Sequence, residues 1–127
     1  MNCRGIRGAI SVDANRAEAI ITATRELLEQ IVAANDLHPA AIASVIFTAT
    51  PDLDAAYPAR AAREMGWVDP PLLCVQEMSV VDSLPRCIRV LIHCNTDKPP
   101  GQLRHVYLGQ ARTLRPDLVE PMVETIG

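Results

Sequence analysis

A positive charge stands in the middle of an apolar stretch of this sequence. Residues 86–94 read RCIRVLIHC, with Arg89 near the centre. A guanidinium in such surroundings needs an anion, because an unpaired charge removed from water is strongly destabilising. Arg7 repeats the pattern in CRGIRGAISV, and a carboxylate, Glu77, follows the apolar run LLCVQ. Glu77 can neutralise only one of the two cations, so the surplus charge indicates an anionic ligand.

Further guanidinium groups are available at Arg60, Arg63 and Arg115. Eleven of the twelve basic residues are Arg, and only Lys98 is Lys. A GC-rich genome would explain this bias, and so would a need for planar donors that bind carboxylates with two parallel hydrogen bonds. An edge strand could also display any single Arg to water. On balance the residues predict an arginine-rich pocket for a polycarboxylate.

Several other chemistries lack their sequence signatures. The sequence contains no GxSxG, P-loop or GxGxxG motif. Cys87, His93, Cys94 and His105 match no common spacing of zinc ligands, so we predict no metal site. Cys74 could serve as a nucleophile, but a lone strand cysteine is more often a small hydrophobic residue. We therefore expect no covalent or metal-assisted reaction.

Length and charge restrict the function further. The 127 residues suffice for a single domain over 1–127, with a C-terminal tail from about residue 115 that could be flexible. The net charge of −3 disfavours a nucleic-acid or anionic-membrane surface. Four cysteines form no CxxC pair, and neither a signal region nor a membrane-spanning stretch is evident. These features predict a cytoplasmic protein.

The pattern of the chain predicts strands interrupted by helices, an α+β or α/β sandwich. A helix that Asp13 caps is expected to run about five turns and to stop at Asn35 and Asp36. A short helix has Pro58 at its first position and Gly66 as its C-terminal stop. Strands are expected at 3–12, 44–50, 72–78, 86–94 and 104–108, with a single helical turn at 39–42. Helices would cover one face of the sheet and leave the other free to pack against something else.

Strand alternation places Arg89 on a mixed face. One face of 86–94 is purely apolar: Ile88, Val90, Ile92 and Cys94. The other carries Arg89 beside Leu91, so it is expected to line a partly buried groove. In the strand before it, Cys74 and Glu77 have opposite parity, and only a bulge or the end of the strand would let both reach one groove.

Seven motifs, taken together, resemble the monofunctional chorismate mutases of the Bacillus type, the AroH-like family. They occur in order as RGIRGA (4–9), TATPDL (48–53), YPARAAREMGW (57–67), CVQEM (74–78), CIRV (87–90), RHVYL (104–108) and LRPDL (114–118). The resemblance covers the chain from residue 4 to about 118. It departs from the family pattern at Tyr57, where Phe is expected, and at residues 79–84, which lack a glycine pair.

The resemblance implies an α+β subunit with a mixed sheet, helices on one face, and a homotrimer with a barrel-like sheet core. Three active sites would lie between neighbouring chains. The implied reaction is the pericyclic, Claisen-type rearrangement of chorismate to prephenate in aromatic amino acid biosynthesis, with no cofactor. No proton transfer or nucleophile is needed, and negative charge develops on the ether oxygen of the substrate as its bond breaks.

By motif position the resemblance also implies the roles of individual residues. Arg89 would meet the developing charge on the ether oxygen, Arg7 a substrate carboxylate, and Glu77 the ring hydroxyl and the positive side of the separating charge. The remaining site residues would be Cys74 as a supporting polar contact, Tyr107 in the cleft, Tyr57, Ala59, Arg60 and Arg63 from the neighbouring chain, and Leu114 and Arg115 where the tail closes.

Two other classes of function remain open at this point. A non-catalytic trimeric module could bind a small carboxylate through Arg7 and Arg63 alone. An interaction protein could use its apolar strand faces for assembly only. The feature that separates the binding module from an enzyme is Glu77 opposite Arg89, a pair that a simple anion sensor would not need. For an interaction protein, Arg89→Ala is expected to leave ligand affinity unchanged.

Overall fold

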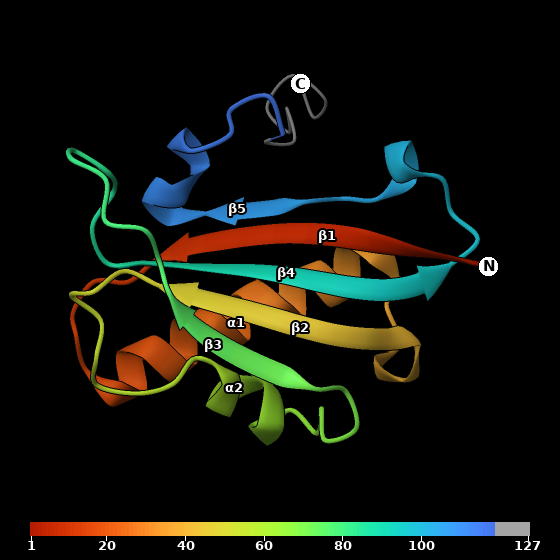
Figure 1. Cartoon of the computed structure of the whole chain (residues 1–127), viewed down its shortest axis with the longest axis horizontal. Coiled ribbons are helices and arrows are strands. Elements are labelled where there is room, and N and C mark those ends of the chain that lie inside the picture. Colours follow the sequence, from red (N-terminus) through yellow and green to blue (C-terminus); the bar gives the residue numbers. More distant parts are fainter. Residues whose placement is uncertain (119–127) are drawn as a thin grey trace.

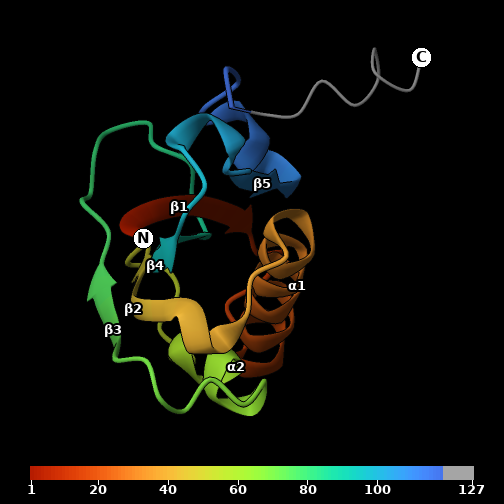
Figure 2. The same cartoon turned by 90° about the vertical axis from the view of Figure 1, so that its right-hand side faces the viewer.

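A five-stranded mixed sheet forms one layer of the protein and two α-helices form the other. The computed structural model describes residues 1–118. Both helices pack on the same face of the sheet (Figure 1 and Figure 2). The elements are β1 (Asn2–Ser11), α1 (Ala17–Asn35), η1 (Pro39–Ala41), β2 (Ile42–Ala49), α2 (Ala59–Glu64), β3 (Leu72–Gln76), β4 (Cys87–Thr96), η2 (Pro100–Gln102), β5 (Val106–Leu108) and η3 (Gly109–Thr113). This arrangement confirms the α+β class.

The strand order is β3-β2-β4-β1-β5, which puts β4 at the centre. β4 runs antiparallel to both β1 and β2, whereas β2–β3 and β1–β5 are parallel pairs. Arg89 lies on β4 and Arg7 on β1, so neither residue is on an edge strand. Display from an edge therefore does not explain these cations.

The helix-covered face of the sheet holds the main core. Ile6, Phe47, Ile88 and Ile92 are fully buried there, as the alternation within the strands predicts. Gly8 allows α1 to come close, because a Cβ at this position would lie 2.7 Å from Cδ1 of Ile31. The glycine in the first strand thus marks a close approach, as expected from the sequence.

The start of the long helix differs from the prediction. Asp13 is not its cap: α1 begins at Ala17, and Arg16 holds the N-cap position in an extended conformation. The loop before it is fixed instead by Asn15, whose Oδ1 accepts the backbone N–H groups of Asp54 and Ala55. Asp13 was thus predicted to cap the helix, whereas the nearby Asn15, a residue of the same type, fixes a loop.

The C-terminal ends of both helices follow the prediction, whereas the start of α2 differs by one residue. Asp36 has a left-handed conformation with φ 49° and stops α1 directly after Asn35. Pro58 precedes the first residue of α2, and Gly66 has φ 90° just beyond its end. A side chain seldom adopts such a backbone conformation, which explains why a glycine stands there.

The strands are confirmed in number and order along the chain, but their boundaries differ by one or two residues, and three differences lie near the predicted site residues. The third strand ends at Gln76, the fourth extends to Thr96, and the fifth is only Val106–Leu108. Glu77 therefore lies just beyond β3, where its backbone N–H donates to the carbonyl of Ala49 at 2.9 Å. By alternation Glu77 shares the face of Leu73 and Val75, which is opposite to that of Cys74.

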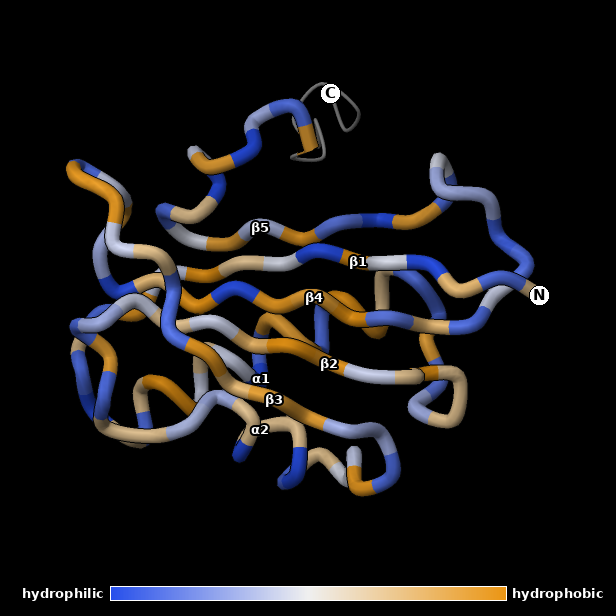
Figure 3. The backbone as a smooth tube through the Cα atoms, in the orientation of Figure 1, coloured by the Kyte–Doolittle hydropathy of each residue, from blue (hydrophilic) through white to orange (hydrophobic). Residues whose placement is uncertain are grey.

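The second face of the sheet, which we call the open face, carries no helix in the described chain. Leu73, Val75 and Leu91 are exposed on it, and apolar residues follow β2 and β3 across the view in Figure 3. β3 and β5 are the two edges, so the sheet of one chain does not close into a barrel. At the β5 side, η3 packs Ala111 against Ala9, Cys87 and Tyr107. None of the helices within residues 1–118 is long and apolar enough to cross a membrane.

Candidate active site

The structure brings Arg7, Glu77, Arg89 and Tyr107 together on the open face. They line a cavity of about 280 Å³. Gly8, Ile46, Thr48, Val90 and Leu91 complete its lining. The four polar side chains come from β1, from the residue after β3, from β4 and from β5, so sequence separation is bridged entirely by strand pairing. We call Arg7, Glu77, Arg89 and Tyr107 the open-face group.

The charge pair at the centre of the open-face group is not closed. Nε of Arg89 lies 3.4 Å from Oε1 of Glu77, and this buried nitrogen has no hydrogen-bond partner among the described residues. The Arg89 side chain as a whole is 42% exposed. Its base is therefore enclosed while the outer guanidinium nitrogens reach the cavity, which leaves a fixed cation with hydrogen-bonding capacity to spare.

Arg7 is held through its backbone. Its N–H donates to Nδ1 of His105 at 2.9 Å, just before β5. Burial, reinforced by the cations of Arg7 and Arg115, lowers the pKa of His105 below its ordinary value of 6.5, which keeps the ring neutral and able to accept this bond. Within residues 1–118 no carboxylate forms an ion pair with the Arg7 guanidinium, so this cation is also free to bind an anion.

Tyr107 is a buried phenol beside these cations. Burial raises its pKa, and the nearby cations of Arg7, Arg115 and Arg89 only partly oppose that effect. The hydroxyl therefore stays protonated at neutral pH and can donate a hydrogen bond. It adds a neutral donor to a pocket that otherwise presents full charges.

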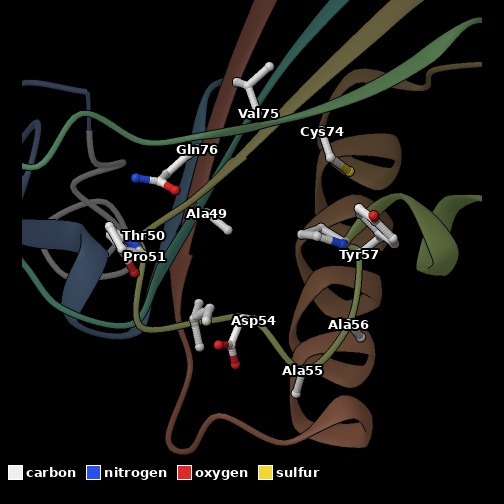
Figure 4. A pocket seen from close by; sticks show the side chains of 12 residues that line it. Ala49, Thr50, Pro51, Asp54, Ala55, Ala56, Tyr57, Cys74, Val75 and Gln76 are labelled. Carbon is white, nitrogen blue, oxygen red and sulfur yellow. The ribbon is translucent and has the colours of Figure 1, made fainter.

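A second set of predicted site residues lies elsewhere, around α2 and β3, and we call it the α2 group: Tyr57, Ala59, Arg60, Arg63 and Cys74. Tyr57 and Cys74 line a separate pocket of about 480 Å³, bounded by β3 and the loop that leads into α2 (Figure 4). Within one chain, then, the predicted site residues do not form a single cluster.

Cys74 belongs to the α2 group and not to the open-face group. It pairs with Phe47, whose side chain is fully buried on the helix-covered face. Burial raises the pKa of the Cys74 thiol, against smaller lowering effects from the Ala59 backbone and the Arg63 cation. The thiol is thus neutral and sits near Arg63. Cys74 and Glu77 have opposite parity, and in the structure they line different pockets.

The two arginines of α2 differ in their partners. Nε of Arg60 lies 2.9 Å from Oε2 of Glu64, one turn along the helix. Arg63 is exposed and forms no ion pair within the described part of the chain. Only Arg63 therefore offers an uncompensated charge from α2.

The segment after η3 lies against the open-face group at Tyr107. Leu114 and Leu118 pack against the small cluster that contains Tyr107. Arg115 pairs with Asp117 through two contacts, of 2.8 and 3.0 Å. The predicted flexible tail from about residue 115 falls mostly outside the described residues. As far as Leu118 the chain forms a turn, with the N–H of Leu118 donating to the carbonyl of Arg115.

Thr48 is the site residue that the sequence reasoning missed. Its hydroxyl donates to Oε1 of Glu77 at 2.5 Å, and it stands directly opposite Arg89 in the β2–β4 register. The available signal was the motif TATPDL, which combines this threonine with Thr50 and Asp52. Oδ1 of Asp52 accepts from the Thr50 hydroxyl, and its carboxylate also accepts the N–H of Arg86, which fixes the chain just before β4.

The described residues contain no group of side chains arranged to bind a metal ion. Across residues 1–118 no three His, Cys, Asp or Glu side chains converge on a common point. Burial raises the pKa of Cys87 to about 11, so its thiol stays protonated at neutral pH. A protonated thiol is a poor metal ligand.

Comparison with known proteins adds a consistent result. The family model described as chorismate mutase type I matches residues 3–118. Chorismate mutase AroH of Bacillus subtilis (strain 168) is 46% identical over 119 residues, which cover 93% of this chain and 94% of that protein. Chorismate mutase AroH of Thermus thermophilus is 53% identical over 116 residues, 91% and 95% of the two chains. The solved structure titled chorismate mutase from Clostridium thermocellum Cth-682 superposes with a TM-score of 0.85 at 47% identity, over 87% of this chain and 98% of that one.

Proposed function

The chain belongs to the chorismate mutase type I family, and we propose that the cavity lined by the open-face group is where it turns chorismate into prephenate. The protein is thus an isomerase of aromatic amino acid biosynthesis. A non-catalytic carboxylate-binding module is not favoured, because the relatives that match nearly the whole chain are named as chorismate mutases.

The buried, unpartnered Nε–H of Arg89 is the observation that best supports this location. In the rearrangement the ether bond breaks ahead of carbon–carbon bond formation, so negative charge gathers on the ether oxygen. A cation fixed on the central strand binds that oxygen more strongly in the transition state than in the ground state, which is the condition for acceleration. Arg89 lies on β4, which is paired with β1 on one side and β2 on the other. Little reorganisation is therefore needed during the reaction.

The remaining open-face residues would grip the folded substrate. Arg7 would bind one carboxylate with its unpaired guanidinium. Glu77 would accept the ring hydroxyl and face the positive side of the separating charge. Tyr107 would donate from its neutral phenol. Holding both ends of the reactive conformer contributes through proximity and orientation.

A homotrimer would complete the site. The exposed apolar side chains of the open face, Leu73, Val75 and Leu91, suit burial against other copies in a barrel-like core of three sheets. The α2 group of one chain, with Tyr57, Ala59, Arg60, Arg63 and Cys74, would then face the open-face group of its neighbour. Leu114 and Arg115 would cover the cleft. The four free thiols suit the cytoplasmic location that we also propose.

Complementation between two damaged chains tests this arrangement. Arg89→Met and Arg63→Met chains, each weakly active alone at chorismate concentrations below the wild-type KM, are co-expressed in equal amounts and assayed there by the ultraviolet absorbance of chorismate. If each site takes Arg89 from one chain and Arg63 from the next, one site in each mixed trimer, or roughly a quarter of all sites after random assembly, carries neither substitution. Activity should then rise well above that of either variant.

The same co-expressed sample can also contradict the proposed arrangement. Two different affinity tags, one on each variant, show that the chains have assembled together. Mixed trimers that stay as inactive as the separate variants would place the whole site within one chain. A wild-type chain that folds but does not consume chorismate would contradict the proposed reaction itself.

A further inference from the structure

Glu77 is fixed at two points by consecutive residues of β2. Its backbone N–H donates to the carbonyl of Ala49 at 2.9 Å, and its Oε1 accepts the hydroxyl of Thr48 at 2.5 Å. Its other carboxylate oxygen, Oε2, has no hydrogen-bond partner among residues 1–118. The carboxylate therefore presents one bound and one free oxygen, in an orientation set by Thr48.

The oxygen that Thr48 holds is the one nearest to Arg89. Oε1 lies 3.4 Å from Nε of Arg89, and no hydrogen bond forms between them. Arg–carboxylate pairs that are free to adjust usually close to about 2.8 Å, often with two parallel bonds. The register places Thr48 directly opposite Arg89, so its hydroxyl competes for Oε1 from the next strand.

We propose that Thr48 is a positioning residue that keeps the Arg89–Glu77 pair open. The inference rests on the proposed roles of these two residues in the rearrangement. With the Thr48 hydroxyl in place, Glu77 stays at the edge of the cavity and the Nε–H of Arg89 remains unsatisfied. Without it, the carboxylate moves onto the guanidinium and the two charges satisfy each other.

A closed pair would weaken catalysis through both partners. Arg89 would meet the ether oxygen with part of its charge and hydrogen-bonding capacity already used. Glu77 would no longer present a free oxygen to the ring side of the substrate. Both losses are felt more in the transition state, where the charges separate, than in the bound substrate. Turnover should therefore suffer more than substrate binding.

The test compares Thr48→Val, which keeps the shape, with Thr48→Ser, which keeps the hydroxyl. Losing a hydrogen bond to a charged group predicts a fall in kcat of about tenfold to a hundredfold for Thr48→Val, with a smaller change in KM. Thr48→Ser should retain most of the activity. Thr96→Val is the matched control, because its hydroxyl accepts the N–H of Lys98 at the far end of β4. Thermal unfolding of each variant separates these effects from loss of the fold.

A second comparison links the effect to the carboxylate. In a Glu77→Gln chain the Thr48→Val substitution should change kcat by less than about threefold, because no carboxylate is left to close on Arg89. If Thr48→Val does not fold, Thr48→Ala carries the same expectations.

The outcomes separate this inference from the proposed function. If Thr48→Val retains the kcat of the Thr96→Val control while Glu77→Gln loses activity, the positioning role is wrong and the proposed site stands. If Glu77→Gln and Arg89→Met both keep wild-type activity, the proposed site itself is wrong. Equal losses for Thr48→Ser and Thr48→Val would also overturn the inference, because the hydroxyl would then not be the cause.

Discussion

The open-face group and the α2 group hold their side chains in different ways. Arg7 and Arg89 are on interior strands of the sheet, and Glu77 is anchored by two hydrogen bonds to β2. In the α2 group, Arg63 projects from a helix of six residues, and Tyr57 is 71% exposed on the loop before it. The first set is immobilised by its own chain, whereas Tyr57 and Arg63 of the second are left on the surface.

Under the proposed function, this contrast corresponds to different roles for the two groups. Stabilising a charge that exists only in the transition state requires donors that are already in place, and paired strands supply them. Binding a carboxylate more or less equally throughout the reaction does not require the same rigidity. Substitutions in the two groups should therefore differ in the size of the effect and in the kinetic constant that changes.

The largest effect is expected for Arg89→Met. Removing a full, preorganised cation should lower kcat by at least about a thousandfold. The melting temperature should change little, because Nε of Arg89 makes no hydrogen bond to Glu77 and Met fits a strand facing a cavity. Steady-state kinetics with chorismate and thermal unfolding measure the two quantities. Arg25→Met, which removes an exposed Arg from α1, is the control. Parallel losses of stability and activity would instead make Arg89 a structural residue and erase the contrast.

A smaller and different effect is expected in the α2 group. Arg63→Met should lower kcat/KM by about tenfold to a hundredfold, mainly by raising KM, because it removes a charged contact made in both states. Arg60→Met should change kcat/KM less, since Glu64 already compensates this cation. Measuring both variants over a range of chorismate concentrations separates KM from kcat. A loss in kcat that matches Arg89→Met would show that the two groups do not differ in role.

The smallest effect is expected from pH and concerns how Arg7 is held. The pKa of His105 is lowered in the fold, so folding favours the neutral ring. The resulting stability is present at neutral pH and is lost as the pH falls through the folded-state pKa, which lies below about 6.5. Thermal unfolding should therefore be constant near pH 7 to 8 and decline in acid, and His105→Asn should reduce the part of the decline that is due to this site.

Turnover supplies the complementary measurement. No group needs to exchange a proton in this rearrangement, so kcat should stay nearly constant around neutral pH, where the His105 ring is neutral. A bell-shaped profile centred near pH 7 would instead indicate general acid–base catalysis. Such a profile would contradict the view that the open-face group acts through fixed charges alone.

The sequence predicted the parts of the fold that local patterns control. Alternation in β4 separated the buried Ile88 and Ile92 from Arg89 and Leu91. The opposite parity of Cys74 and Glu77 was also evident, but both residues were predicted to belong to one site, whereas they line different pockets. The left-handed residues that end the helices were identified from residue type. The predicted cap at Asp13 was wrong because several polar residues precede α1. Contacts with the loop around Asp54 determine that Asn15 is the one that fixes this part of the chain. Local sequence cannot rank such competitors.

By itself, then, the sequence determined the element types, the face on which each strand residue lies, and, through seven motifs, the family of the enzyme. These properties depend on side-chain period, backbone preference and residue identity, all of which are written along the chain. Only the tertiary structure decided that Thr48 stands opposite Arg89, that Glu77 is held 3.4 Å from that cation without a hydrogen bond, and that Cys74 joins Arg63. Those relations depend on strand register and on where β3 ends, which distant segments fix through their mutual packing.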